Sequence, residues 1–248
     1  MRPLLFAIQF LTTLPIRTSF EVTPRLMARA MAWFSVVGLM LGGVLVVVDA
    51  ALRMIFPPAV AAALLLVVWV ALTGALHLDG FLDCCDGLLG AGSPQKRLQI
   101  LRDVRVGAFG VVGAICLLGV KVSVLIGLAG HHRAAALLTV PALTRAAMVY
   151  AARAYDYARP GPGLGQVFRQ GLRWRHVLLA GAVALAAGGS ALGVLGLGLA
   201  AWVWLMTTLI AWWVQRRIPG LTGDVYGAIN ELTETGALLG LLAVGRWL

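Results

Sequence analysis

The sequence has few charged residues. Only 12% of its 248 residues are charged, whereas a soluble domain carries about a quarter. Sixty per cent of the residues are hydrophobic, and the mean hydropathy is +0.91. This composition excludes an ordinary soluble globular protein, and no polar run is long enough to build a second core. We therefore expect a single integral membrane domain over residues 1–248.

Cysteines are also scarce, and their spacing does not suit a disulfide framework. Cys84 and Cys85 are adjacent, and Cys116 lies in an apolar run.

Several apolar runs approach or exceed the roughly 20 residues that cross a bilayer. We predict an all-α fold, a polytopic membrane helical bundle with about seven transmembrane helices, six to eight being compatible with the pattern. The predicted spans are residues 30–52, 58–76, 107–130, 134–152, 176–195, 197–214 and 235–247, after an interfacial arm at residues 1–28.

Positive charge is distributed unevenly between the predicted loops. If the N-terminus is cytoplasmic, 15 of the 20 cations fall in the inside segments 1–29, 77–106, 153–175 and 215–234. Only Arg53, Arg133 and Arg246 would lie outside, while Lys121 and Arg145 stay within spans. Because Lys and Arg accumulate in cytoplasmic loops, this bias sets the topology. It also explains the net charge of +10 without a nucleic-acid partner.

Seven of the ten carboxylates lie in two segments on that same side: Asp79, Asp83, Asp86 and Asp103 in the first, and Asp224, Glu231 and Glu234 in the second. The first segment includes the stretch LHLDGFLDCCDGLLG, in which the three aspartates fall within about 60° on a helix. Three such carboxylates repel one another, and their desolvation near a bilayer is costly. A hard divalent cation offsets both effects. Mg²⁺ is the expected cofactor, because it binds a few carboxylates and bridges to substrate phosphates. Gly80 and Gly87 would let a substrate or another backbone approach closely.

Two other interpretations of this stretch stay open. The acids could neutralise nearby arginines at the membrane surface: Arg97, Arg102 and Arg105. A zinc site would use His77, Cys84 and Cys85. Zinc is disfavoured, because His77 points away from the aspartate face and neighbouring cysteines diverge by about 100° on a helix.

The following stretch, GAGSPQKRLQILRDVRVGAFG, predicts a turn and a basic amphipathic helix. Ser93 suits the N-cap and Pro94 the first helical position, with the helix running over residues 95–105. This helix would bind anionic lipid at the interface. A compatible hypothesis is that Arg97, Arg102 or Arg105 clamps a phosphate while Asp103 adds to the metal site.

The second acidic segment contains the stretch GLTGDVYGAINELTE. Asp224 and Glu231 are seven positions apart and share a helical face, with Asn230 and Glu234 displaced around it. The preceding glycines indicate a helix start, where backbone N–H groups favour anions; an ordinary loop with a helix cap is the alternative.

Arg145 sits in an apolar span and must face protein or water. The segment 152–168 combines aromatics, cations and glycines, which suits a nucleotide or macrocycle surface or a plain loop.

Carboxylates that hold Mg²⁺ among cations suit phosphoryl transfer. Asp83-x-x-Asp86-Gly87 resembles the start of the signature of CDP-alcohol phosphotransferases, but the rest of that signature is missing. A closer resemblance covers nearly the whole chain. HLDGFLDCCDG followed by KRLQILRDVRVGAFG is similar to the cobalamin synthase family, the adenosylcobinamide-GDP ribazoletransferases. Further matches are QFLTTLPI (9–16), AWFSVVGLMLG (32–42), PALTRAAM (141–148) and TGDVYGAINELTE (222–234).

The resemblance implies a Mg²⁺-dependent transferase of cobalamin biosynthesis in the cell inner membrane, with its active site on the cytoplasmic face. It would join α-ribazole, or its 5′-phosphate, to adenosylcobinamide-GDP and release GMP. The candidate catalytic residues are Asp79, Asp83, Asp86 and Asp103. The candidate metal ligands are these four together with Asp224 and Glu231. The candidate substrate-binding residues are His77, Gly80, Gly87, Arg97, Arg105, Arg145, Asp224 and Asn230.

Two rival functions remain. One is a CDP-alcohol-type phospholipid synthase, which would use a CDP-linked donor. The other is a cation-coupled transporter, which would need carboxylates near the bilayer midplane, accessible from both faces. The carboxylates are instead predicted at span ends on one face, which favours an enzyme. A homo-oligomer, or an association with other cobalamin-assembly enzymes, is left open.

Overall fold

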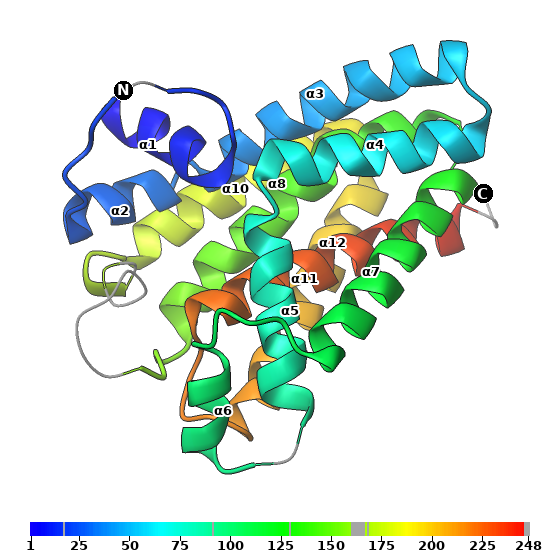
Figure 1. Cartoon of the computed structure of the whole chain (residues 1–248). Coiled ribbons are helices and arrows are strands. Elements are labelled where there is room, and N and C mark those ends of the chain that lie inside the picture. The colour runs from blue at the N-terminus through cyan, green and yellow to red at the C-terminus, as the bar shows by residue number, and fades with distance from the viewer. Residues whose placement is uncertain (17, 91, 129, 160–166, 168, 246–248) are drawn as a thin grey trace.

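The chain folds into helices. The computed structural model describes residues 1–245 apart from 17, 91, 129, 160–166 and 168 (Figure 1). The described residues form eleven helices and no strand: α1 (Arg2–Leu11), α2 (Pro24–Met31), α3 (Phe34–Ile55), α4 (Pro58–Thr73), α5 (Leu76–Leu89), α6 (Pro94–Ile100), α7 (Ala108–Gly127), α8 (His131–Ala154), α10 (Trp174–Leu192), α11 (Val194–Gln215) and α12 (Gly223–Val244). The prediction of an all-α polytopic bundle is confirmed.

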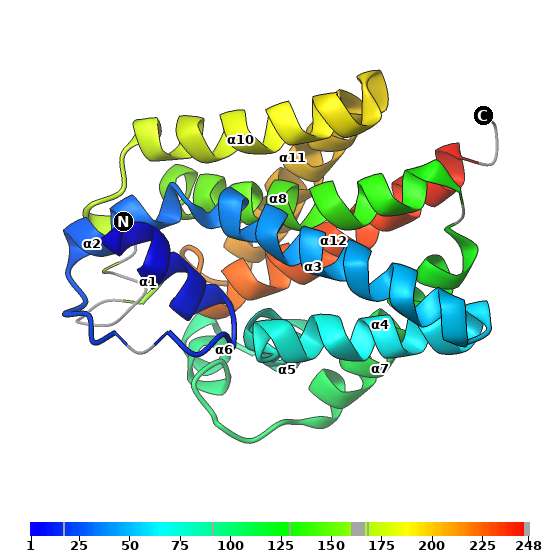
Figure 2. The same ribbon diagram turned by 90° about the horizontal axis from the view of Figure 1, so that it is seen from above.

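The helices are arranged in layers around α8. Figure 2 shows α10 on one face and α4, α5 and α7 on the opposite face, with α8 and α12 between them. α8 packs against α3, α10 and α12. As a result, 72% of the apolar stretch of α8 is buried, against at most 39% in the other spans. α8 is therefore the central helix of the bundle, and α12 packs beside it.

Five helices are long and apolar enough to cross a membrane: α3, α7, α8, α10 and α11. A sixth span results if α4 and α5, which meet at a bend of 92°, are counted together. The prediction of about seven is met only at its lower limit of six. Residues 235–244 of the predicted seventh span, 235–247, form the second half of the longer helix α12, which carries three carboxylates and is not among these candidate spans; residues 246 and 247 lie outside the described residues.

Two glycines of α3 allow a close contact with α8. A Cβ atom at Gly38 of α3 would lie 2.5 Å from the carbonyl oxygen of Pro141 in α8, and one at Gly42 would collide with the backbone of Leu138. The Gly38-x-x-x-Gly42 spacing places both glycines on one side of α3, so that the two backbones touch. Small residues at such spacing allow close packing of helices inside a membrane.

The predicted helix over residues 95–105 is shorter than expected. Ser93 accepts a hydrogen bond from the amide of Lys96 (3.3 Å) and Pro94 begins α6, as predicted. The helix ends at Ile100, however. Asp103 accepts a hydrogen bond from the amide of Arg105 (3.1 Å), and this local side-chain contact competes with continuation of the helix.

The predicted inside segments meet at one end of the bundle. The amide of Ala158 donates to the carbonyl of Leu221 (2.8 Å), which joins the segment after α8 to the connection between α11 and α12. Arg159 reaches the carbonyl of Leu101 beyond α6 (2.9 Å). These contacts agree with the predicted alternation of the spans, while the side of the membrane that this end faces stays a prediction. Of the cations used for that topology, Arg17 and Arg246 lie outside the described residues.

Candidate active site

α5 carries three aspartates on one side, as predicted. The helix begins directly after a sharp bend at Gly74 and Ala75, both of which have positive φ. Its opposite side is buried, whereas Asp79 is exposed and Asp83 and Asp86 are half-buried. Asp83 interacts electrostatically with both neighbouring aspartates. The α5 carboxylates therefore form one partly accessible cluster.

α12 crosses α5 at two glycines and adds a fourth carboxylate. A Cβ atom at Gly80 would lie 2.7 Å from the carbonyl oxygen of Asp224, and one at Gly227 would lie 2.9 Å from the carbonyl oxygen of His77. Because the backbones touch here, Asp224 interacts electrostatically with Asp83 and Asp79. The structure thus unites the two acidic stretches through Asp224. We call Asp79, Asp83 and Asp224 the carboxylate cluster.

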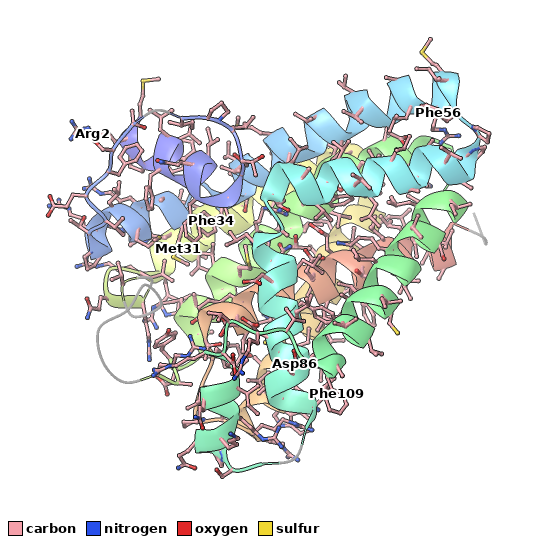
Figure 3. All side chains as sticks on the ribbon, in the orientation of Figure 1. Arg2, Met31, Phe34, Phe56, Asp86 and Phe109 are labelled. Atoms are coloured by element: carbon pink, nitrogen blue, oxygen red, sulfur yellow. The ribbon has the colours of Figure 1, made fainter. Side chains whose placement is uncertain are left out.

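Asp86 holds the start of α7. Its two carboxylate oxygens accept hydrogen bonds from the amides of Gly107 (2.7 Å) and Gly110 (2.9 Å). A Cβ atom at either glycine would lie 2.5 Å from this carboxylate, so both positions need glycine. Figure 3 marks Asp86 on α5 and Phe109 in the first turn of α7. Asp86 thus caps a helix whose orphan N–H groups favour an anion, a task that the sequence pattern alone did not reveal.

Asp103 pairs with a neighbouring arginine instead of joining the other carboxylates. Its carboxylate pairs with Arg105 (2.8 Å) at the surface. Hydrogen bonds from Arg105 lower the pKa of Asp103 to about 2. A carboxylate with so low a pKa is a poor proton acceptor, so the structure assigns Asp103 and Arg105 to each other rather than to the cluster.

Arg159 is the functional candidate that the sequence pattern missed. Its Nη2 atom lies 2.6 Å from Oδ2 of Asp224 and 2.9 Å from the carbonyl oxygen of Leu101. It also interacts electrostatically with Asp83. The only signal was its place in the cation-rich segment 152–168, of which residues 160–166 and 168 lie outside the described residues.

Arg97 and Gly87 hold α6 against the end of α5. The guanidinium of Arg97 donates to the carbonyls of Leu88 (2.7 Å), Gly87 (3.3 Å) and Gly92 (3.1 Å). It therefore satisfies backbone acceptors that the end of α5 leaves unpaired. A Cβ atom at Gly87 would lie 2.7 Å from the side chain of Leu101. Among the described residues no ion pair joins Asp79, Asp83 or Asp86 to an arginine of this region, so the interpretation that the α5 acids neutralise Arg97, Arg102 and Arg105 is not supported.

Glu231 belongs to a separate buried charge network. Its carboxylate binds Lys121 of α7 (2.7 Å), and Lys121 also binds Glu234 (2.8 Å). Glu234 in turn binds Arg145 of α8 (3.1 Å). Glu231 lies seven residues beyond Asp224, which is about 10 Å along a helix. We call Lys121, Arg145, Glu231 and Glu234 the buried charge network; it joins α12 to α7 and α8.

His77 and Asn230 lie in the same buried region. His77 is buried and interacts electrostatically with Arg145 and Lys121, on the side of α5 opposite the aspartates. Asn230 is fully buried, and neither atom of its amide has a hydrogen-bond partner among the described residues. Cys85 packs against α7, because a Cβ atom at Gly113 would lie 2.6 Å from its sulfur.

The carboxylate cluster offers the kind of donor that a magnesium ion prefers. All the donors are carboxylate oxygens, which hard cations prefer. No group of three His, Cys, Asp or Glu side chains in the described part of the chain is arranged to hold a metal ion. The cluster is therefore not a closed protein cage. Mg²⁺ does not need one, because it binds through one or two carboxylates and completes its shell with water and phosphate.

Comparison with known proteins points to one enzyme family. Residues 3–242 match the family described as cobalamin-5-phosphate synthase. A protein of Stutzerimonas stutzeri named adenosylcobinamide-GDP ribazoletransferase is 42% identical over 99% of this chain and 100% of its own length. Proteins of the same name from Pseudomonas aeruginosa (41%, covering 97% of this chain and 98% of that protein) and Geotalea daltonii (37%, covering 96% of each) are also similar. No solved structure matches the chain.

Proposed function

The chain belongs to the cobalamin-5-phosphate synthase family, and on that premise we propose that it joins α-ribazole, or its 5′-phosphate, to adenosylcobinamide-GDP with release of GMP. The chain is a transferase of cobalamin biosynthesis and a multi-pass membrane protein. The observation that carries the finer proposal is the carboxylate cluster formed by α5 and α12 with Arg159 beside it. Carboxylates and a cation at one place suit the transfer of a phosphoryl group between two oxygen atoms.

In the proposed reaction, a ribose hydroxyl of α-ribazole attacks the phosphorus on the cobinamide side of the diphosphate. A new P–O bond forms, the bond from this phosphorus to the bridging oxygen breaks, and GMP leaves with that oxygen. The hydroxyl proton passes to a carboxylate of the cluster, which acts as general base. Asp224 is joined by Arg159 to the connection after α6, at the end of the bundle where the loops meet, which supports access to the cluster from that end.

Mg²⁺ is the proposed cofactor. Bound with the diphosphate, it would neutralise charge on the phosphates and on the departing GMP. Asp79, Asp83 and Asp224 would supply its protein ligands. Asp86 keeps its hydrogen bonds with the amides of α7, and Glu231 keeps its ion pair with Lys121, so neither is a proposed ligand. Asp103 takes no part in the proposed metal site, because it pairs with Arg105.

We propose that the cluster faces the cytoplasm in the inner membrane. The distribution of basic residues supports this orientation. A transporter would need carboxylates reachable from both faces, whereas the cluster lies at one end of the spans. A CDP-alcohol-type synthase is supported only by the local Asp83-x-x-Asp86-Gly87 pattern. An enzyme that acts on cytosolic substrates is therefore favoured over both.

The test is an assay of purified membranes with adenosylcobinamide-GDP, α-ribazole and Mg²⁺, in which GMP release is followed. Wild-type protein should release GMP, and EDTA should stop the release. Asp83→Asn should lower the rate by about 100-fold or more, since it removes a base or ligand carboxylate. Release of CMP from a CDP-linked donor, with no turnover of the GDP-linked corrinoid, would contradict the proposal, as would wild-type rates for Asp83→Asn.

A further inference from the structure

Arg159 occupies the place at the carboxylate cluster where a metal–phosphate pair would bind. Its Nη2 atom lies 2.6 Å from Asp224, and Asp83 interacts with the same guanidinium. The side chains of Arg159 and Asp224 are 18% and 21% exposed, so ligands can reach the pair. One guanidinium thus balances part of the charge of two carboxylates.

Of the other arginines that suit phosphate binding by sequence, Arg97, Arg105 and Arg145 have structural partners. Arg97 donates to three backbone carbonyls. Arg105 binds Asp103 at the surface, and Arg145 is fully buried beside Glu234. The partners of these three arginines lie outside the carboxylate cluster. Arg159, by contrast, already stands among the carboxylates.

Arg159 also keeps hydrogen-bonding capacity in reserve. Both of its hydrogen bonds to described residues, to Asp224 and to the carbonyl of Leu101, come from Nη2. Its Nε atom is buried and has no partner among the described residues. A guanidinium has five N–H donors in a planar fork, which suits two oxygens of a phosphate at once. Nη1 makes no hydrogen bond to a described residue, so its donors are available to an anion.

We propose that Arg159 is an exchangeable counter-ion: it neutralises Asp224 and Asp83 before substrate binds, and it donates to the diphosphate of the nucleotide substrate afterwards. This inference rests on the proposed function, which supplies a diphosphate. In the exchange, Arg159 releases a carboxylate and gains phosphate oxygens, so it remains paired throughout. No covalent bond is made or broken.

If Arg159 exchanges partners, its replacement should change two binding affinities in opposite directions, which the loss of a purely structural residue would not do. Arg159 competes with Mg²⁺ for Asp224 when substrate is absent, and it binds the diphosphate when substrate is present. Arg159→Gln should therefore bind Mg²⁺ more tightly than wild type, by several-fold. The same variant should bind adenosylcobinamide-GDP more weakly, by about 10- to 100-fold, because a charge-assisted hydrogen bond is lost.

Two binding measurements on full-length protein in detergent or proteoliposomes test this. Mg²⁺ binding is measured by calorimetry without nucleotide. Adenosylcobinamide-GDP binding is measured from the corrinoid colour that sediments with the proteoliposomes. Arg159→Lys should keep Mg²⁺ affinity near wild type and lose part of the nucleotide affinity, because an ammonium lacks the planar fork. Arg169→Gln is the matched control, because Arg169 pairs with Asp156 on the same connection and should change neither affinity.

Opposite changes in the two affinities of Arg159→Gln support the exchange. A parallel loss of both affinities, or an unchanged nucleotide affinity, would overturn it. If Arg159→Gln does not fold, Arg159→Lys decides the question, and nucleotide binding equal to wild type would then refute the proposal. Failure of the proposed function looks different, because wild-type protein itself would then neither bind adenosylcobinamide-GDP nor release GMP.

Discussion

Asp83 and Asp86 show that aspartates one turn apart can have different tasks. Both lie on the same side of α5 and both belong to the Asp-x-x-Asp-Gly pattern. Asp86 has both oxygens bound to amides of α7. Asp83 accepts no hydrogen bond from a described residue, and it interacts with three other carboxylates. Removing the charge should therefore affect folding at Asp86 and chemistry at Asp83.

Asp86→Asn should destabilise the protein more than Asp83→Asn does. The substitution removes the charged acceptor of two backbone hydrogen bonds, each worth about 1.5–3 kcal/mol when the acceptor is charged. Thermal unfolding in detergent measures the difference, with Asp83→Asn as the matched control. Equal melting temperatures for the two variants would show that the cap on α7 does not contribute to stability.

At the level of elements, α12 is positioned from both sides. Its first turns touch α5 at Gly80 and Gly227. One to two turns later, the buried charge network ties it to α7 and α8. Lys121 also lies over the ring of Trp69, 5.2 Å from its centroid. The network has two positive and two negative groups, so it is neutral as a whole, and its rigidity fixes the rotation of α12 that presents Asp224 to α5.

Lys121→Met should destabilise the bundle, and adding Glu231→Gln should restore much of the loss. The single substitution leaves an uncompensated buried carboxylate, and breaking such a pair costs about 3–5 kcal/mol. The double substitution restores neutrality. Unfolding midpoints and folded yield in detergent measure both variants. A double variant as unstable as Lys121→Met would mean that packing around Lys121, rather than its charge, matters.

For the whole molecule, the decisive property is that the loops carrying the site share one end of the bundle. α5, α6, the segment after α8 and the start of α12 are joined there by Arg159 and by the hydrogen bonds around Leu221. The connection between α3 and α4 lies at the opposite end (Figure 1). Under the proposed function, substrates that meet at the cluster would approach from this one end of the bundle.

Cysteine labelling should place Gln95 and Pro219 on the cytoplasmic side and Pro57 on the other side. All three residues are exposed. In a variant without Cys84, Cys85 and Cys116, single cysteines at these positions are treated with an impermeant maleimide, in intact cells and in inverted vesicles. Gln95→Cys and Pro219→Cys should react only in inverted vesicles. Labelling of these two positions from opposite sides would refute a single site built from α5 and α12.

The sequence by itself determined the local features. Apolar runs of membrane length gave six of the predicted helices close to their observed bounds, because burial of apolar side chains dominates there. The face of α5 followed from spacing alone, since residues 79, 83 and 86 lie within two turns. The cap at Ser93 followed from its own neighbours. Such features depend on residues close in the chain, and a periodic pattern records them.

Tertiary structure alone decided the partners. Glu231 and Asp224 share a helix, yet Glu231 binds Lys121, which is 110 positions away, while Asp224 joins Asp83 and binds Arg159, which is 65 positions away. By sequence, Asp86 fits a metal ligand equally well. In the structure its carboxylate oxygens accept hydrogen bonds from the amides of Gly107 and Gly110. These pairings depend on where helices cross, and that is fixed by contacts such as Gly80 against Asp224. The physical reason is that a carboxylate takes whichever donor the packed backbone brings within hydrogen-bonding distance.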